Sequence, residues 1–189
     1  APHLDKGILI GAALALVLYL YRTMKPRVAQ LGRHVDGTLR DVKVHPDLPT
    51  SEHIVAMRFD GQLYFANVSY FEDMVLETIA SSPKAKYLLV VGNGINQLDA
   101  TGEEAIRTIH ERLAEAGVTL VFSGLKKQVL DVMRATGLLD EIGAKHIFPS
   151  EDHALAAIYD WLGEEAKGEQ FCPVGRDSLI PNLQVRPQH

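Results

Sequence analysis

The stretch 86–102, KYLLVVGNGINQLDATG, constrains the fold of this chain more than any other. Residues 87–91 are an unbroken apolar run, which is typical of a strand covered on both faces and too short for a buried helix of ordinary length. A turn rich in Gly and Asn follows, and from residue 99 onward apolar residues recur at helical spacing. Because a helix N-terminus at the end of a strand exposes unpaired N–H groups, we expect function here first.

The glycines of this turn do not complete a phosphate-binding motif. Gly92 and Gly94 begin like a dinucleotide fingerprint, but Gln97 stands where the third glycine belongs, and no Gly-Lys-Ser/Thr motif is present. Thr101 and Glu104 fit a capping box, in which Thr101 would be the N-cap of the following helix. The loop is therefore interpreted either as a plain helix start or as a functional surface.

The rest of the chain alternates between strand and helix patterns. Residues 54–59 and 62–66 read as paired strands joined by an Asp60-Gly61 turn, with a weaker strand near 38–44. Ser69 opens a second capping box and a helix that stops before Pro83. Further strands are predicted at 118–122 and 146–148, and further helices at 126–136 and after Ser150. This alternation predicts an α/β fold with a mostly parallel sheet and covering helices.

The N-terminal apolar run, residues 7–21, contains 15 residues, fewer than the ~20 that cross a hydrocarbon core. It fits the end of a transmembrane helix, a signal-peptide core or a buried helix. Tyr19 and Tyr21 at its far end, followed by basic residues, favour a membrane helix with a cytoplasmic flank. Its shortness, and a chain that opens with Ala1, suggest a piece of a longer protein.

Charge changes sign after this run. Residues 22–43 carry a net charge of +4, whereas residues 44–189 carry −9. A basic segment before an acidic domain suits anionic lipid headgroups, although a solvated linker explains it too. The acidic remainder argues against nucleic acid as a partner. The predicted organisation is a membrane helix end at 1–23, a basic linker at 24–36, a domain at 37–163 and a flexible tail at 164–189.

Other residue types predict no chemistry. The single cysteine, Cys172, can form no internal disulfide and fits a reducing cytosol. The eight histidines show no metal-ligand spacing beside a carboxylate, so no metal is expected. Asn67 begins a glycosylation sequon, but its place before a helix explains it without a sugar. With no convincing acid/base pair, we do not expect an enzyme.

The order of these elements, with Asp-Ala-Thr-Gly in the central loop, resembles a STAS domain, the fold shared by sulfate transporters and anti-sigma factor antagonists. The stretch 57–67, MRFDGQLYFAN, is similar to the transporter branch, the SulP anion permeases. The resemblance covers the chain up to Gly163. It implies a STAS-like, mostly parallel or mixed sheet with covering helices, directly after the last membrane helix on the cytoplasmic side.

The resemblance also implies a regulatory loop that binds a nucleotide or a partner, formed here by Asn96, Asp99, Ala100, Thr101 and Gly102. In the antagonist branch a phosphorylatable serine follows the aspartate, where this chain has Ala100. Only Thr101 is left as a phosphate acceptor. The acidic residues around the helix start weigh against strong nucleotide binding, because a phosphate would meet like charge. No cofactor is therefore expected, with a nucleotide as the one open alternative.

The function expected from this resemblance is a non-catalytic regulatory and interaction domain of a SulP-type secondary anion transporter, of the sulfate, bicarbonate or dicarboxylate class. It would lie on the cytoplasmic face of the cell inner membrane. Its expected partners are the transporter's own membrane domain, a cytosolic regulatory protein and a second copy, in a homodimer formed through the parent transporter. The alternative is a soluble phospho-switch protein like the anti-sigma factor antagonists, against which Ala100 and the apolar N-terminus argue.

Overall fold

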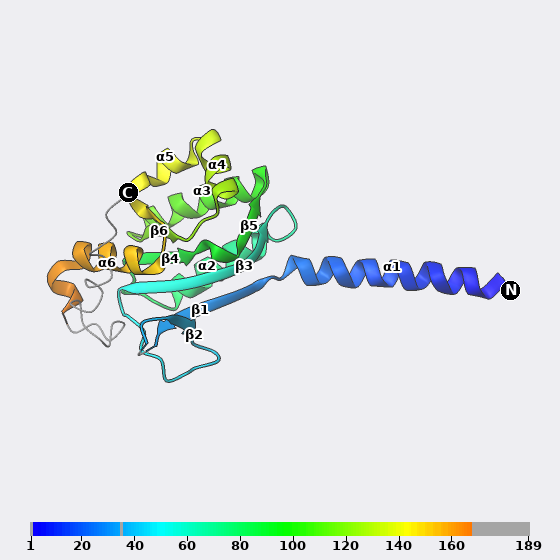
Figure 1. Cartoon of the computed structure of the whole chain (residues 1–189), viewed down its shortest axis with the longest axis horizontal. Helices are drawn as coiled ribbons and strands as arrows, with labels where there is room; N and C mark the ends of the chain where they lie inside the picture. The colour runs from blue at the N-terminus through cyan, green and yellow to red at the C-terminus, as the bar shows by residue number, and fades with distance from the viewer. Residues whose placement is uncertain (1, 35, 168–189) are drawn as a thin grey trace, which may run out of the picture.

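The computed structural model describes residues 2–34 and 36–167 and shows an α/β domain from which one long helix projects (Figure 1). The strands are β1 (Arg27–Arg33), β2 (Leu39–Asp41), β3 (Ile54–Leu63), β4 (Tyr87–Val91), β5 (Ile95–Leu98), β6 (Thr119–Ser123) and β7 (Ile147–Phe148). The helices are α1 (Pro2–Met24), α2 (Val68–Ala80), α3 (Ala100–Glu115), α4 (Lys127–Ala135), α5 (Leu138–Ile142) and α6 (Glu151–Leu162), with short 3-10 turns at Gly92–Gly94, Ala144–His146 and Gly163–Ala166.

The strands form one mixed sheet in the order β2-β1-β3-β4-β6-β7, and β5 pairs with the end of β3. β3, β4, β6 and β7 run parallel, whereas β1 is antiparallel to both β2 and β3. In the centre, Ala56 lies opposite Leu89, and Leu89 lies opposite Val121. The apolar runs of β4 and β6 are buried on both faces, as predicted.

Two hydrophobic cores lie on the two faces of this sheet. One face packs against α2, α3, α4 and α5, through residues such as Phe71, Ile106 and Val129. The other face packs against α6, whose Leu155 and Ile158 are fully buried. Ser150 caps α6 by accepting a hydrogen bond from the backbone N–H of His153, which confirms the predicted start of that helix.

Helix α1 is long enough to cross a bilayer and none of its span is buried. Its apolar part, Leu4–Met24, has 21 residues with a mean hydropathy of 1.7 and no share of that span buried against the domain. The interpretation as a buried helix of a soluble domain is therefore wrong. The helix exceeds the apolar run of 7–21 because its polar flanks continue the same helical turns.

The segment expected as a basic linker is instead part of the sheet. β1 pairs with both β2 and β3, and its Ala29 and Leu31 are buried in the second core. The basic side chains of Arg27 and Arg33 stand at the ends of this strand and mask its apolar alternation in the sequence. The folded domain thus begins before residue 37.

The hairpin expected at Asp60-Gly61 is also wrong, because β3 runs unbroken for 10 residues. Gly61 lies beside Pro26, and a Cβ at Gly61 would stand 3.0 Å from the Cβ of that proline. Asp60 is held by an ion pair with Arg58 at 3.0 Å. The Asp-Gly pair thus allows a close approach within the sheet, where the sequence pattern indicates a turn.

Two smaller expectations need correction. Helix α2 begins at Val68 with Asn67 as its N-cap position, so Ser69 is not the cap. At the other end, residues 163–166 form a 3-10 turn whose Glu165 pairs with Lys86 at 2.5 Å, so the predicted flexible tail does not begin at 164. The rest of that tail, with Cys172, lies outside the described residues.

Candidate regulatory loop

The loop after β4 contains a strand that the sequence pattern did not indicate. After the turn at Gly92–Gly94 the chain forms β5, in which Gly61 of β3 pairs with Ile95 and Leu63 pairs with Leu98. The ends of β5 are buried and its middle residues, Asn96 and Gln97, are exposed. Such a short apolar-polar-polar-apolar pattern fits neither the two-residue period of a strand nor the 3.6-residue period of a helix. These residues form a strand because they pair with β3.

Asp99, and not Thr101, is the N-cap of α3. Its Oδ1 accepts a hydrogen bond from the backbone N–H of Gly102 at 2.7 Å, while its Oδ2 accepts one from the backbone N–H of Phe65 at 3.1 Å. Thr101 lies in the first turn of α3 with an exposed side chain, so the predicted capping box is wrong. Aspartate and threonine are both good caps, and the extended backbone of Asp99 puts the helix start there.

Gly102 is required by the packing of α3 onto β3. A Cβ at Gly102 would stand 2.4 Å from the carbonyl oxygen of Leu63 and 2.9 Å from the Cδ1 of Leu98. A side-chain carbon cannot lie so close to a backbone oxygen unless the helix or the strand moves. Ala100, the first residue of α3, is exposed and lacks a hydroxyl, so it can carry no phosphate.

Asn96 is turned toward α4. Its side-chain oxygen accepts a hydrogen bond from the Lys126 ammonium group, and its backbone oxygen accepts one from Nε2 of Gln128 at 3.0 Å. The predicted site residues therefore lie at the same end of the sheet, but they belong to two separate groups of hydrogen bonds. Residues 99–102 start α3, and Asn96 joins β5 to the start of α4.

The charges around the α3 N-terminus leave little room for a phosphate. Glu103 is buried and pairs with Arg107 at 2.5 Å. The same guanidinium group also pairs with Glu104 at 3.6 Å and with Glu141, so one cation serves three carboxylates. Asp99 already accepts from the N–H of Gly102. This arrangement suits a solvated or protein-binding surface better than a nucleotide site.

Phe65 and Asn67 form part of the site that sequence reasoning missed. The Asn67 side chain is buried and closes the loop by accepting from the N–H of Tyr64 at 3.1 Å and donating to the carbonyl of Gln62 at 2.8 Å. Phe65 is 73% exposed, the highest value for a large hydrophobic residue in the described part of the chain. An asparagine directly before a helix is the only local signal for such a turn.

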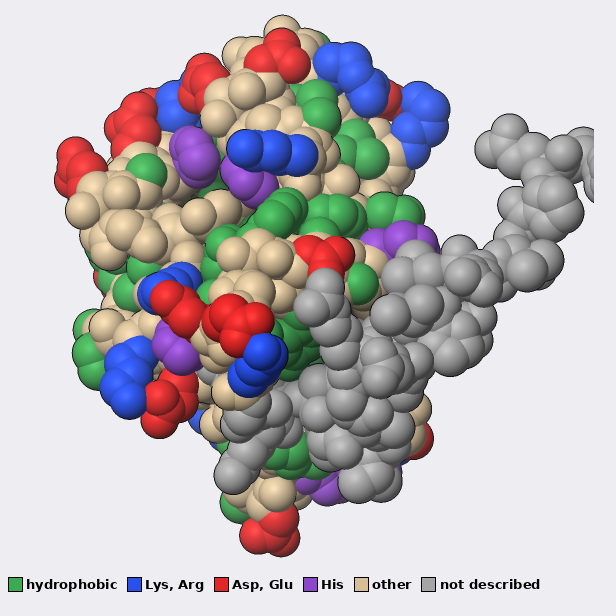
Figure 2. Space-filling model, turned by 90° about the vertical axis from the view of Figure 1, so that its left-hand side faces the viewer, with side chains coloured by type: hydrophobic (Ala, Val, Ile, Leu, Met, Phe, Trp, Pro, Cys, Tyr) green, Lys and Arg blue, Asp and Glu red, His purple; other side chains and the backbone are tan. Residues whose placement is uncertain are grey.

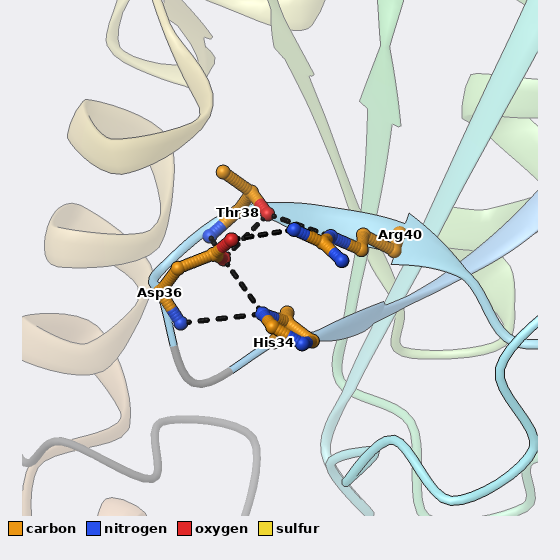
Figure 3. Close-up of polar contacts among 4 residues, drawn as sticks. All are labelled: His34, Asp36, Thr38 and Arg40. Carbon is orange, nitrogen blue, oxygen red and sulfur yellow. Dashed lines mark hydrogen bonds and ion pairs between the residues drawn. The ribbon is translucent and has the colours of Figure 1, made fainter.

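A second polar cluster closes the turn between β1 and β2 (Figure 3). The Asp36 carboxylate accepts hydrogen bonds from the hydroxyl of Thr38 at 2.6 Å, from the N–H of Thr38 at 3.0 Å and from Arg40 at 2.5 Å, and it lies 3.0 Å from Nδ1 of His34. The hydrogen bonds from Thr38, aided by His34 and Arg40, hold the pKa of Asp36 well below its ordinary value. Because all four residues belong to one turn, the cluster has a structural role.

No group of three or more His, Cys, Asp or Glu side chains within 2–34 and 36–167 is placed to hold a metal ion. The expectation that the protein uses no metal stays a prediction.

A mixed sheet with five parallel strands, helices on both faces and an unburied apolar helix before its first strand defines an α/β domain carried by a membrane-type helix. The chain belongs to the STAS domain family, whose sequence signature matches residues 45–154. This confirms the resemblance and the fold class expected from it.

The relatives of this chain are sulfate transporters. It is 27% identical over 178 residues to the probable sulfate transporter 4.2 of Arabidopsis thaliana, an alignment that covers 88% of this chain and 26% of the relative. The chain spans about a quarter of the length of the curated relatives it matches.

Solved structures show the same fold. The murine Solute Carrier 26 family member A9 anion transporter superposes with a TM-score of 0.70 at 19% identity, over 79% of this chain and 25% of that one. The STAS domain of a SulP transporter from Vibrio cholerae superposes with a TM-score of 0.51 at 20% identity, over 64% and 92%.

Proposed function

We propose that this chain is the cytoplasmic regulatory domain of a SulP-type secondary anion transporter and that α1 is the end of the last membrane helix. The observation that carries the proposal is the junction of α1 with the sheet. An unburied apolar span of 21 residues ends at Met24, and β1, a full member of the STAS sheet, begins at Arg27. Arg22, Lys25 and Arg27 around this junction are exposed, as expected on the cytoplasmic side.

The transported anion is of the sulfate, bicarbonate or dicarboxylate class, and the names of the relatives favour sulfate. The domain itself is non-catalytic in this proposal. It works through residues 99–102, which meet the transporter's own membrane domain or a cytosolic regulatory protein, and the parent transporter forms a homodimer. A phospho-switch of the antagonist kind is disfavoured, because the residue after Asp99 is the hydroxyl-free Ala100.

Thr101→Asp in the intact transporter tests this role of the loop. The side chain is exposed and makes no capping bond, so the substitution leaves the core alone while adding negative charge beside Glu104. Negative charge in a first helical turn is favourable by roughly 0.3–1 kcal/mol, so folding is retained. We expect altered sulfate uptake at unchanged thermal stability, with Thr101→Ser as the matched control.

Unchanged uptake by the Thr101→Asp variant would leave the loop as a helix start only. The location is tested separately by fractionating cells that express the native parent. Recovery of the parent in the soluble fraction contradicts the membrane assignment.

A further inference from the structure

We propose that the loop at residues 64–67, here called the aromatic loop, rests on the lipid headgroups beside α1 and places Phe65 in the membrane interface. This inference deepens the proposed function and depends on α1 crossing the bilayer. The occupant we assign to this surface is a bilayer that contains anionic lipid.

The pairing of β1 with β3 brings the aromatic loop to the membrane end of the domain. Arg27, at the start of β1, lies opposite Asp60 of the antiparallel β3. The next residue of β3, Gly61, packs beside Pro26, which precedes β1. Beyond Gly61 the chain runs on toward the end of α1, at ~3.3 Å per strand residue. Figure 1 shows the loop after β3 next to the junction of α1 and β1.

The side chains at this end suit a membrane interface. Phe65 projects into solvent with 73% of its surface exposed, and the ring of Tyr64 meets it edge-on with centroids 5.4 Å apart. Aromatic rings are favoured at the level of the headgroups, where one end is apolar and the other wet. The exposed basic residues Arg22 and Lys25 stand on the same junction and attract anionic headgroups, whereas Arg27 beside them is paired with Asp41 at 2.7 Å.

The exposure of Phe65 is built into the structure. Its backbone N–H is held by Asp99, and the preceding residue, Tyr64, is held by the buried side chain of Asn67. Two side chains, Asp99 and Asn67, thus fix a loop whose largest apolar side chain faces outward. A loop shaped only for water has no need to hold a phenylalanine in this position, whereas a membrane contact gains apolar burial from it.

The opposite end of the domain supplies an internal control, because it also carries a partly exposed aromatic side chain. Trp161, the only tryptophan of the chain, stacks on Tyr87 with ring centroids 5.8 Å apart. Tyr87 is the first residue of β4, which is parallel to β3, so Trp161 lies at the end of the sheet away from the aromatic loop. Figure 2 shows this end, where acidic, basic and histidine side chains surround a band of hydrophobic side chains.

The test uses tryptophan emission from the whole chain reconstituted into bilayers of phosphatidylcholine and phosphatidylserine, with and without brominated acyl chains. One sample is the unaltered chain, which reports Trp161. The other carries Phe65→Trp together with Trp161→Phe. We expect brominated lipid to remove most of the emission of the double variant and to leave that of the unaltered chain unchanged. We also expect weaker quenching in bilayers without phosphatidylserine.

Equal emission of the double variant with and without bromine overturns the inference. An alkaline wash separates this failure from that of the proposed function, because a chain that washes off the bilayer has no membrane-spanning α1. Emission of the double variant that is blue-shifted but unquenched assigns the loop to a protein contact and also overturns the lipid assignment. If Phe65→Trp fails to fold, a spin label on Phe65→Cys in a Cys172→Ser chain measures the same depth.

Discussion

Phe65 donates its backbone N–H to Oδ2 of Asp99 at 3.1 Å, across 34 positions of sequence, while Oδ1 of the same carboxylate caps α3 through the N–H of Gly102. One side chain therefore fastens the aromatic loop to the start of α3. The position of Phe65 and the start of α3 therefore depend on the same carboxylate. The two surfaces proposed for control and for membrane contact are thus mechanically one unit.

Asp99→Ala should destabilise the domain by about 0.5–2 kcal/mol, because it removes the cap of α3. Asp99→Asn should destabilise the domain less, since the amide oxygen of asparagine can still accept the hydrogen bond from Gly102. Its NH2 group cannot accept the bond from the N–H of Phe65, so that bond should be lost. Urea unfolding measures the first effect, and amide hydrogen exchange at Phe65 measures the second. If the amide hydrogen of Phe65 exchanges at the same rate in Asp99→Asn and in the unaltered chain, the hydrogen bond from Phe65 to Asp99 does not protect the aromatic loop.

Gly102→Ala should destabilise the domain by roughly 1–3 kcal/mol, because the new methyl group overlaps the carbonyl oxygen of Leu63, 2.4 Å from its position. Thr101→Ala is the matched control, since the Thr101 side chain is exposed and caps nothing, and we expect it to stay within about 0.5 kcal/mol of the unaltered chain. Both are compared by denaturant midpoint. Equal midpoints would mean that α3 can move away from β3 without cost.

A fragment that begins at Pro26 and ends at residue 167 should unfold cooperatively, whereas one that begins at Gly37 should not fold. The shorter fragment lacks β1, so it loses the buried Ala29 and Leu31 and leaves one edge of β3 unpaired. Far-ultraviolet circular dichroism during heating distinguishes the two. A cooperative transition in the fragment from Gly37 would restore the boundary expected from the sequence.

The turn between β1 and β2 should loosen at acid pH. The hydrogen bonds from Thr38, with His34 and Arg40, place the folded pKa of Asp36 below its unfolded value of about 3.9. A lowered carboxyl pKa stabilises the fold fully above the unfolded value, and that contribution is lost as the pH falls toward the folded value. The amide resonance of Thr38 should therefore shift only in strong acid. Asp36→Asn should remove this shift in strong acid, and a shift centred near 4 in the unaltered chain would contradict the assignment.

Much of the fold followed from local pattern alone. The apolar runs that became β4 and β6 admit only strands buried on both faces, and Ser150 before an amphipathic stretch admits only a helix start. The tyrosines at the end of the first apolar run, and the basic residues after it, indicated a membrane-type helix. The structure shows that helix with no part of its apolar span buried. Each of these signals lies within one element, because burial on a face repeats with the period of that element.

The site was decided by contacts between elements. β1 carries arginines at both ends and β5 is too short for a period, so each is a strand only because β3 pairs with it. Asp60-Gly61 has the composition of a turn, yet β3 continues through it to Leu63, with Pro26 packed beside Gly61. Asp99 and Thr101 are both acceptable caps in sequence, and the second bond of Asp99, to Phe65, exists only in the folded chain. Sequence alone thus determined the fold class and those elements whose pattern is local, such as β4, β6 and α6. Tertiary pairing decided β1, β5, the unbroken β3, the cap of α3 and the exposed aromatic loop, because those contacts join residues that no local period connects.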